Sequence, residues 1–282
     1  MTNYNTKEQT NFTVFGSPEE YLHYINGVNS IYIWHPDPSF FGRSLPEAKK
    51  ALAQGDTTYL ARAQAIIDKM VDAQIFYTGK LELVNDFVGF LPNIPAALAG
   101  QPQDMYNIQE TENQNITTPL NIYIETLVSE GVSHEKLIAR GVAVLAFCLA
   151  MNNIRPVELY TICIGKPQNS KHKSGGIVCR VPSKPIDLER ATFMLCDPAY
   201  YRQLAFIAMG DHVKSNNTHI QWPWDNPPTA PDHEPRMREL LDMQPEDVFM
   251  PGGYLFDQLM LDNPVQWVRN MIQKHSGQTT GE

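Results

Sequence analysis

The sequence predicts an α/β fold in which a mixed sheet is covered by helices, and three features in the middle of the chain indicate it. Residues 120–128 form an apolar run typical of a buried strand, and Ser133 then begins a long apolar helix that ends near residue 152. Residues 157–164 form a second apolar run. Strand, helix and strand in this order predict a right-handed crossover between parallel strands. The turn at Ser174-Gly175-Gly176 predicts that a third strand, residues 177–181, runs antiparallel to the second.

The N-terminal region, residues 1–79, is predicted to be mainly helical and to pack on this core. Ser17 followed by Pro18 is a typical helix start, and Asp56 begins an amphipathic helix that continues to about Gln74. Residues 31–34 are predicted to form a short strand, which the prolines at positions 36 and 38 close.

The core, residues 80–210, is expected to end with two helices. The first spans about residues 187–195, and the second has Asp197 as its cap and stops at Gly210. Residues 211–282 are predicted to be a proline-rich surface segment followed by helices at 235–243 and 264–274. We expect the three regions to form one compact domain.

The predicted core is compatible with the topology of von Willebrand A domains. In those domains a D-x-S-x-S motif after the first strand holds a metal ion, and the equivalent residues here are E-T-L-V-S, 125–129. Leu127 stands where a hydroxyl ligand is required, which leaves Mg²⁺ with too few protein oxygens. The architecture is therefore expected without an intact metal site.

Motifs of enzymes and cofactor sites are missing from the sequence. It contains no G-x-S-x-G, no phosphate-binding G-x-x-x-x-G-K-[ST] and no dinucleotide fingerprint, and Ile138 stands where a zinc helix beginning at His134 needs a second histidine. We therefore expect a protein that is not an enzyme and needs no cofactor. The four cysteines lie in apolar patterns without C-x-x-C spacing, which predicts buried reduced thiols.

The longest apolar runs, such as residues 142–151, are too short to span a bilayer, and the polar start lacks a secretory signal. These features predict a cytosolic protein without membrane partners.

The strongest local signal is a basic segment, residues 165–186, in a chain of formal net charge -9. The segment contains no acidic residue and five cations, namely Lys166, Lys171, Lys173, Arg180 and Lys184. A loop that meets phosphates has this composition. The alternative is a solvated hairpin whose lysines keep an exposed strand edge from pairing with other chains.

Aromatic residues lie near two groups of cations. Tyr160, Tyr200, Tyr201 and Arg202 lie beside the basic segment in sequence, and a second cluster contains Tyr32, Trp34, Phe40, Phe41 and Arg43. Unpaired DNA is bound by cations that contact its phosphate backbone and by flat side chains on which its bases stack. Each of these rings is also compatible with a place in the core. The candidate DNA-binding residues are Lys166, Lys171, Lys173, Arg180, Lys184, Tyr201, Arg202, Trp34 and Arg43.

Two segments carry a family resemblance. They are L-E-L-V-N-D-F-V-G-F-L-P-N-I-P-A-A-L-A-G-Q-P-Q-D-M from Leu81 and V-S-H-E-K-L-I-A-R-G-V-A-V-L-A from Val132. Over residues 75–210 the chain resembles an uncharacterised family of tailed-phage proteins and, within it, the single-stranded-DNA-binding RNA polymerase cofactors of short-tailed phages that use their own polymerases. The resemblance implies binding to unpaired DNA, a role in transcription and a place in the cytoplasm of the infected host cell. It implies no particular binding residues.

We therefore expect a homo-oligomeric single-stranded-DNA-binding cofactor of a phage RNA polymerase. The first alternative is an adaptor or virion-assembly protein whose basic segment contacts an acidic partner. The second is a hydrolase whose site has no recognisable motif.

Overall fold

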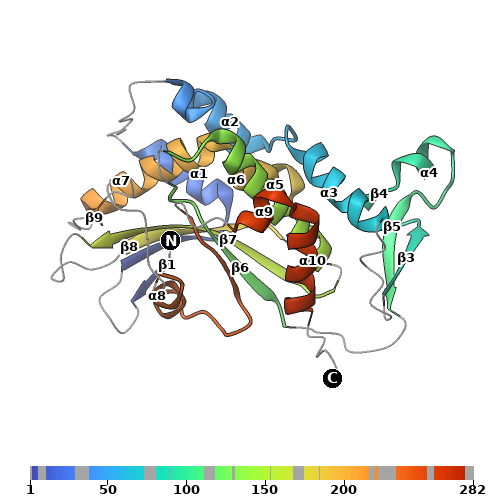
Figure 1. The fold of residues 1–282 in the computed structure, drawn as a ribbon. Helices are drawn as coiled ribbons and strands as arrows, with labels where there is room; N and C mark the ends of the chain where they lie inside the picture. The colour runs from blue at the N-terminus through green and yellow to red at the C-terminus, as the bar shows by residue number, and fades with distance from the viewer. Residues whose placement is uncertain are drawn as a thin grey trace.

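A computed structural model gives the fold of the chain (Figure 1). It describes residues 2–5, 11–28, 38–72, 81–89, 91–110, 118–128, 131–152, 154–167, 175–183, 185–215, 220–221, 233–252 and 257–276. The strand predicted at residues 31–34 lies outside these ranges.

A mixed sheet forms the centre of the described structure. Its strands follow the order β1-β2-β8-β7-β6-β10, and β9 also pairs with β7. Pairing is parallel for β6 with β7, β6 with β10 and β2 with β8, and antiparallel for β7 with β8, β7 with β9 and β1 with β2. The strands are β1 (Thr2–Asn5), β2 (Asn11–Phe15), β6 (Leu120–Glu125), β7 (Val157–Pro167), β8 (Gly175–Val181), β9 (Ile220–Gln221) and β10 (Val248–Met250).

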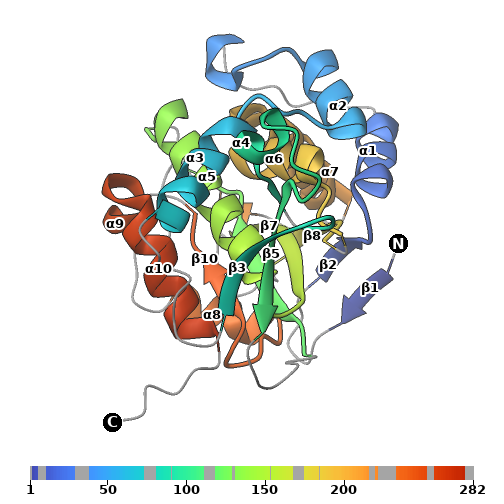
Figure 2. The same ribbon diagram turned by 90° about the vertical axis from the view of Figure 1, so that its right-hand side faces the viewer.

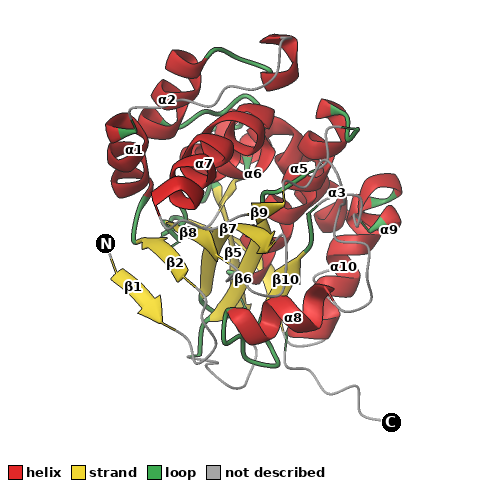
Figure 3. Cartoon of the chain, turned by 90° about the vertical axis from the view of Figure 1, so that its left-hand side faces the viewer, coloured by secondary structure: helices red, strands yellow, loops and turns green. Residues whose placement is uncertain are grey.

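Most of the described helices cover one face of this sheet, and α8 lies against the other face (Figures 1 and 3). The mixed α/β class with covering helices is thus confirmed. The helices are α1 (Pro18–Gly27), η1 (Pro38–Phe41), α2 (Leu45–Gln54), α3 (Leu60–Asp72), α5 (His134–Met151), α6 (Leu188–Cys196), η2 (Tyr200–Leu204), α7 (Ala205–Ser215), α8 (His233–Leu240), α9 (Gln258–Asp262) and α10 (Pro264–His275).

A second, smaller sheet stands to one side of the main sheet (Figures 1 and 2). It is antiparallel, with the strand order β3-β5-β4, and a short helix, α4, follows β4 in the chain. Sequence reasoning assigned no structure to this segment. Its elements are β3 (Leu81–Asp86), β4 (Leu91–Pro92), α4 (Ile94–Leu98) and β5 (Met105–Glu110).

The predicted crossover and hairpin are both present. Helix α5 connects the parallel strands β6 and β7, and β8 returns antiparallel to β7. The side chains of Ser17, Ser133 and Asp187 accept hydrogen bonds from backbone N–H groups in the first turns of α1, α5 and α6. These caps satisfy donors that a helix cannot pair internally, which is why the helix starts were readable from sequence.

Other predicted boundaries were wrong. Helix α7 continues past Gly210 to Ser215, and α3 begins at Leu60 rather than at Asp56. The carboxylate of Asp56 instead accepts hydrogen bonds from the N–H and hydroxyl of Thr58 in the turn before the helix. The N-terminal region also contributes β1 and β2 to the main sheet, so the sheet takes strands from all three regions defined by the sequence.

Two apolar clusters hold the layers together. The larger one lies between the sheet and its helices and includes residues from Phe15 to Ile272. The smaller one lies on the second face, where Ile162, Ile164 and Val178 meet Met237 of α8. Because side chains alternate along a strand, β7 contributes to both clusters.

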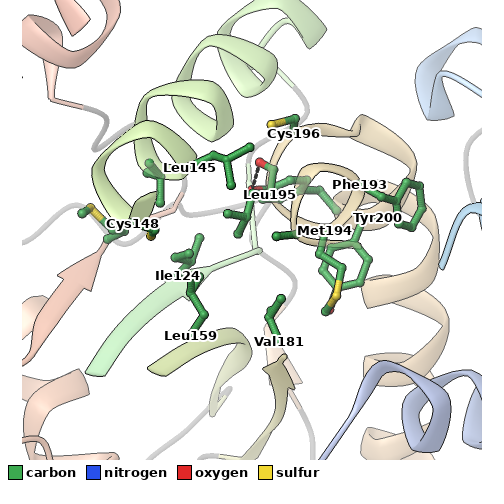
Figure 4. Close-up of a cluster of buried hydrophobic side chains, with 14 of the residues drawn as sticks. Ile124, Leu145, Cys148, Leu159, Val181, Phe193, Met194, Leu195, Cys196 and Tyr200 are labelled. Atoms are coloured by element: carbon green, nitrogen blue, oxygen red, sulfur yellow. Dashed lines mark hydrogen bonds between the residues drawn. The ribbon is translucent and has the colours of Figure 1, made fainter. Parts of the chain in front are cut away.

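The cysteines lie in the larger cluster. All four, Cys148, Cys163, Cys179 and Cys196, are free and buried, as predicted (two of them are in Figure 4).

A buried arginine connects β6 to β10. Arg140 of α5 is 1% exposed, and its Nη2 donates hydrogen bonds to the carbonyl oxygens of Glu125, Met250 and Pro251 at 3.0–3.1 Å. Burial lowers the pKa of Arg140, while the hydroxyl of Tyr201 and the carboxylate of Glu125 act against that shift. One guanidinium therefore satisfies backbone acceptors at the carboxyl ends of two neighbouring strands.

Candidate nucleic-acid interface

A row of side chains crosses four strands on the second face of the main sheet. Phe249 of β10 is paired in register with Tyr123 of β6, Tyr123 with Tyr160 of β7, and Tyr160 with Arg180 of β8. Residues paired in register point to the same face of a sheet. We call these four residues the aromatic row; it contains three rings and ends at a cation.

The two tyrosines at the centre of the aromatic row are stacked. The ring centroids of Tyr123 and Tyr160 are 5.0 Å apart, and the ring planes differ by 14°. Both side chains are half-buried. Burial, together with the nearby Asp247 carboxylate, raises the pKa of Tyr123, so its ring stays neutral. Flat, neutral rings at a partly open surface provide the geometry on which bases stack.

Arg180 is the cation at the end of this row. Its Nε donates to Oε2 of Glu158 at 2.8 Å, and Nη2 contacts the same oxygen. The side chain of Arg180 is 42% exposed, whereas that of Glu158 is 10% exposed. The exposed part of the guanidinium can contact a phosphate, while Glu158 holds the side chain of Arg180 beside Tyr160.

The remaining cations of the basic segment are only partly described. The backbone of Lys166 pairs with Gln221 near the end of β7. Lys171, Lys173 and Lys184 lie outside the described residues, as does Trp34 of the second cluster. The segment that contains Lys171 and Lys173 connects β7 to β8, the two strands that carry Tyr160 and Arg180.

The edge-protection interpretation of the basic segment loses support. Strand β7 pairs with β6 on one side and β8 on the other, and β8 also pairs with β2. Among the described strands the ends of the main path are β1 and β10. The basic segment therefore joins two interior strands, which need no protection from edge-to-edge pairing.

Tyr201 and Arg202 belong to the core, which corrects their assignment to a DNA-binding surface. Tyr201 is 0% exposed and donates its hydroxyl hydrogen to the carbonyl oxygen of Leu195 at 2.6 Å. Arg202 is 3% exposed and donates to the carbonyl oxygens of Phe40 and Val132. A base cannot stack on a ring that has no exposed surface, and a phosphate cannot reach a guanidinium enclosed by carbonyls.

Arg43 is at the surface but has two acidic partners. Its guanidinium contacts Asp56 at 2.7 Å and also Asp197, and it lies 5.5 Å from the ring centroid of Phe193. Burial lowers the pKa of Arg43, but the carboxylates of Asp197 and Asp56 outweigh that effect and the pKa is raised. These contacts indicate that Arg43 joins the α2–α3 connection to α6, which leaves it a poor phosphate ligand.

The residues compared with a metal-binding motif have structural partners. Oε2 of Glu125 accepts a hydrogen bond from the N–H of Gly252 at 2.7 Å, and the hydroxyl of Thr126 donates to the carbonyl of Ile162 at 2.9 Å. Ser129 lies outside the described residues. No cluster of three or more His, Cys, Asp or Glu residues that could hold a metal ion is found in the part of the chain that the structure describes.

Comparison with protein families gives one match. The profile of a domain of unknown function, DUF7192, matches residues 4–249. The chain belongs to this family. The residues that match DUF7192 include all four members of the aromatic row. No curated protein and no solved structure matches the chain. None of the helices in the described ranges is long and apolar enough to cross a membrane.

Sequence reasoning named Tyr160 and Arg180 but missed Tyr123. In the first four residues of β6, L-N-I-Y, the buried Leu and Ile alternate with the half-buried Asn and Tyr. This alternation of residue types is a detectable signal for two unlike faces. Nothing in the sequence gives the register that aligns Tyr123 with Tyr160, because register depends on pairing between strands far apart in the chain.

Proposed function

We propose that the protein binds single-stranded DNA without strong sequence preference and acts as a non-enzymatic cofactor of a phage RNA polymerase in the infected host cell. The observation that supports DNA binding is the aromatic row, with Tyr123 and Tyr160 stacked beside Arg180. The polymerase and the phage host rest on the family resemblance described above.

In this proposal the two kinds of contact have separate roles. Bases stack beside the Tyr123–Tyr160 pair, and the backbone runs toward Arg180 and the lysines between β7 and β8. Phosphate contacts supply affinity that depends on salt, and stacking supplies affinity that does not depend on sequence. The acidic balance of the chain, whose net charge is -9 even with the basic segment included, disfavours unspecific adsorption of duplex DNA.

The test is fluorescence anisotropy of a labelled single strand and of the matching duplex at low salt. We expect the single strand to bind more tightly and Tyr160→Ala to weaken its binding by about 1 to 3 kcal/mol. The matched control is Tyr24→Ala, because Tyr24 is also half-buried but lies on α1, where its hydroxyl donates to Asp211 at 2.7 Å. If Tyr160→Ala and Tyr24→Ala lost the same amount of affinity for the single strand, the aromatic row would not be the surface that binds DNA.

A second candidate function is that of an adaptor protein. Four large apolar side chains on and beside the small sheet are highly exposed, and they are Phe87 (64%), Val88 (77%), Ile94 (57%) and Leu98 (85%). Large exposed apolar side chains are a common feature of surfaces that meet another protein. If no single strand binds at low salt, where phosphate contacts are strongest, the adaptor function becomes the better proposal.

A further inference from the structure

A small cavity lies at the outer edge of β10, between α8 and α10. Its volume is about 140 Å³. Its walls are formed by Phe249 and Met250 on β10 and by Met260 and Trp267 opposite them, all of which are 3–6% exposed. The cavity includes Pro251, just past the carboxyl end of β10, and ligands of open α/β sheets bind outside the carboxyl ends of the strands.

Strand β10 is the last strand of the main path, and the residues that line the cavity come mainly from β10, α8, α9 and α10 and include none from β6. The cavity therefore lies on the side of β10 that faces away from β6. Arg140 lines the inner end of the cavity, but its Nη2 is already engaged by three carbonyl oxygens.

One polar atom in the lining has no partner. His275 is 9% exposed, and its Nε2 is buried without a hydrogen bond. Burial and, secondarily, the charge of Lys274 lower the pKa of His275 to about 4, so the ring is neutral near pH 7. Each nitrogen of a neutral imidazole either donates or accepts one hydrogen bond, so Nε2 can pair with a ligand that supplies the complementary group.

The charges at the mouth of the cavity favour a neutral ligand. Arg238 and Lys274 are balanced there by Glu234 and Asp257, and Nε of Arg238 donates to Glu234 at 2.9 Å. A charged ligand would gain little from this balanced rim. The volume also limits the ligand, because an apolar cavity of about 150 Å³ in another protein holds benzene.

We propose that this cavity binds one neutral, planar, six-membered ring that forms a hydrogen bond with Nε2 of His275. Phe249 and Trp267 contact the body of the ring, and the hydrogen-bonding group is an N–H or O–H on its edge. A phenol and a pyrimidine base share this chemistry, whereas a two-ring purine or indole exceeds the volume. The ligand source is either a free small molecule or a pyrimidine within a single strand. Only the second source rests on the proposed function.

The experiment compares phenol with toluene, which have similar shapes and differ in the hydrogen-bond donor. Titrations of the full-length protein are followed by long-range ¹H–¹⁵N spectra of the histidine rings. We expect phenol to bind about tenfold more tightly than toluene and to shift the Nε2 resonance of His275. His275→Phe should remove the preference for phenol. The wild-type shift tests the proposal even if that variant does not fold.

Thymidine and a short oligothymidine distinguish the two sources. A His275 shift with thymidine alone indicates a free ligand, and a shift with the oligonucleotide at lower concentration indicates a base in a strand. Equal affinity for phenol and toluene, or no change at His275 with phenol, would overturn the proposal. Failure of oligothymidine to bind the protein at all would contradict the proposed DNA-binding function but leaves the phenol result intact.

Discussion

Replacing Arg140 with methionine should strongly destabilise the fold. Methionine fills much of the same volume but donates no hydrogen bond. The change removes the donor to the carbonyls of Glu125, Met250 and Pro251, which lie 3.0–3.1 Å from Nη2, and the contact from Nη1 to the hydroxyl of Tyr201 at 3.4 Å. The carbonyls would then be left at the ends of β6 and β10 without this partner.

The size of the effect follows from these contacts. A hydrogen bond to a charged group contributes about 1.5–3 kcal/mol, but the three carbonyls share one nitrogen and their contributions do not add fully. Removing the buried charge also relieves its desolvation cost, which offsets part of the loss. We therefore expect Arg140→Met to lower the free energy of unfolding by about 3–5 kcal/mol.

The assay is equilibrium unfolding in urea followed by far-ultraviolet circular dichroism. Arg62→Met is the matched control, because it removes a guanidinium whose ion pair with Glu135 is at the surface, where the two side chains are 44% and 70% exposed. We expect that control to change the free energy of unfolding by no more than about 1 kcal/mol. If Arg140→Met were no more destabilising than Arg62→Met, the structural role assigned to Arg140 would be refuted.

Three further predictions concern packing, thiols and pH. A Cβ at Gly141 would lie 1.9 Å from the carbonyl oxygen of Leu195, so Gly141→Ala should lower the free energy of unfolding in urea by about 1–3 kcal/mol. The control Gly27→Ala should not destabilise the protein, because a Cβ at Gly27 would have no other atom within 4 Å. Burial raises the pKa of all four cysteine thiols, so a thiol reagent should label them quickly only in denaturant, and fast labelling of the native protein would contradict their burial. Burial lowers the pKa of His275 from 6.5 to about 4, so the unfolded chain binds more protons between these values. The contribution of the neutral His275 ring to the free energy of unfolding should therefore be complete above pH 6.5. It should fall by up to roughly 3 kcal/mol as the pH drops toward 4. His275→Phe should flatten that part of the stability curve, and an unchanged curve would contradict the assigned shift.

The elements that sequence reasoning placed correctly are those whose signals are local. Ser133 caps α5, and the apolar runs on either side of that helix are β6 and β7. Capping and periodicity involve residues a few positions apart, so they can be read without the fold. The N-terminal strands β1 and β2 carry no such signal, because β2 enters the sheet by pairing with β8, more than a hundred residues later, and β1 enters it by pairing with β2.

The candidate site was only partly predictable for the same reason. Arg180 and Tyr160 were named from composition, but their alignment with Tyr123 depends on strand register. Tyr201 was assigned to the surface although it lies in an apolar stretch whose helix is buried on all sides. The hydroxyl group of a tyrosine does not show whether the residue is buried or exposed, because a buried hydroxyl can form its hydrogen bond inside the core. The hydroxyl of Tyr201, for example, donates to the carbonyl oxygen of Leu195.

The most direct test of the account is the salt dependence of single-strand binding by the wild-type protein and by the double variant Lys171→Ala, Lys173→Ala. If all five cations of the basic segment meet phosphates, the slope of log affinity against log salt is about -3.5, at roughly -0.7 for each contact. The double variant should remain folded, flatten the slope by roughly 1.4 and weaken binding equally for different sequences. A folded double variant with an unchanged slope would contradict the account and place the DNA contacts, if any, outside the basic segment.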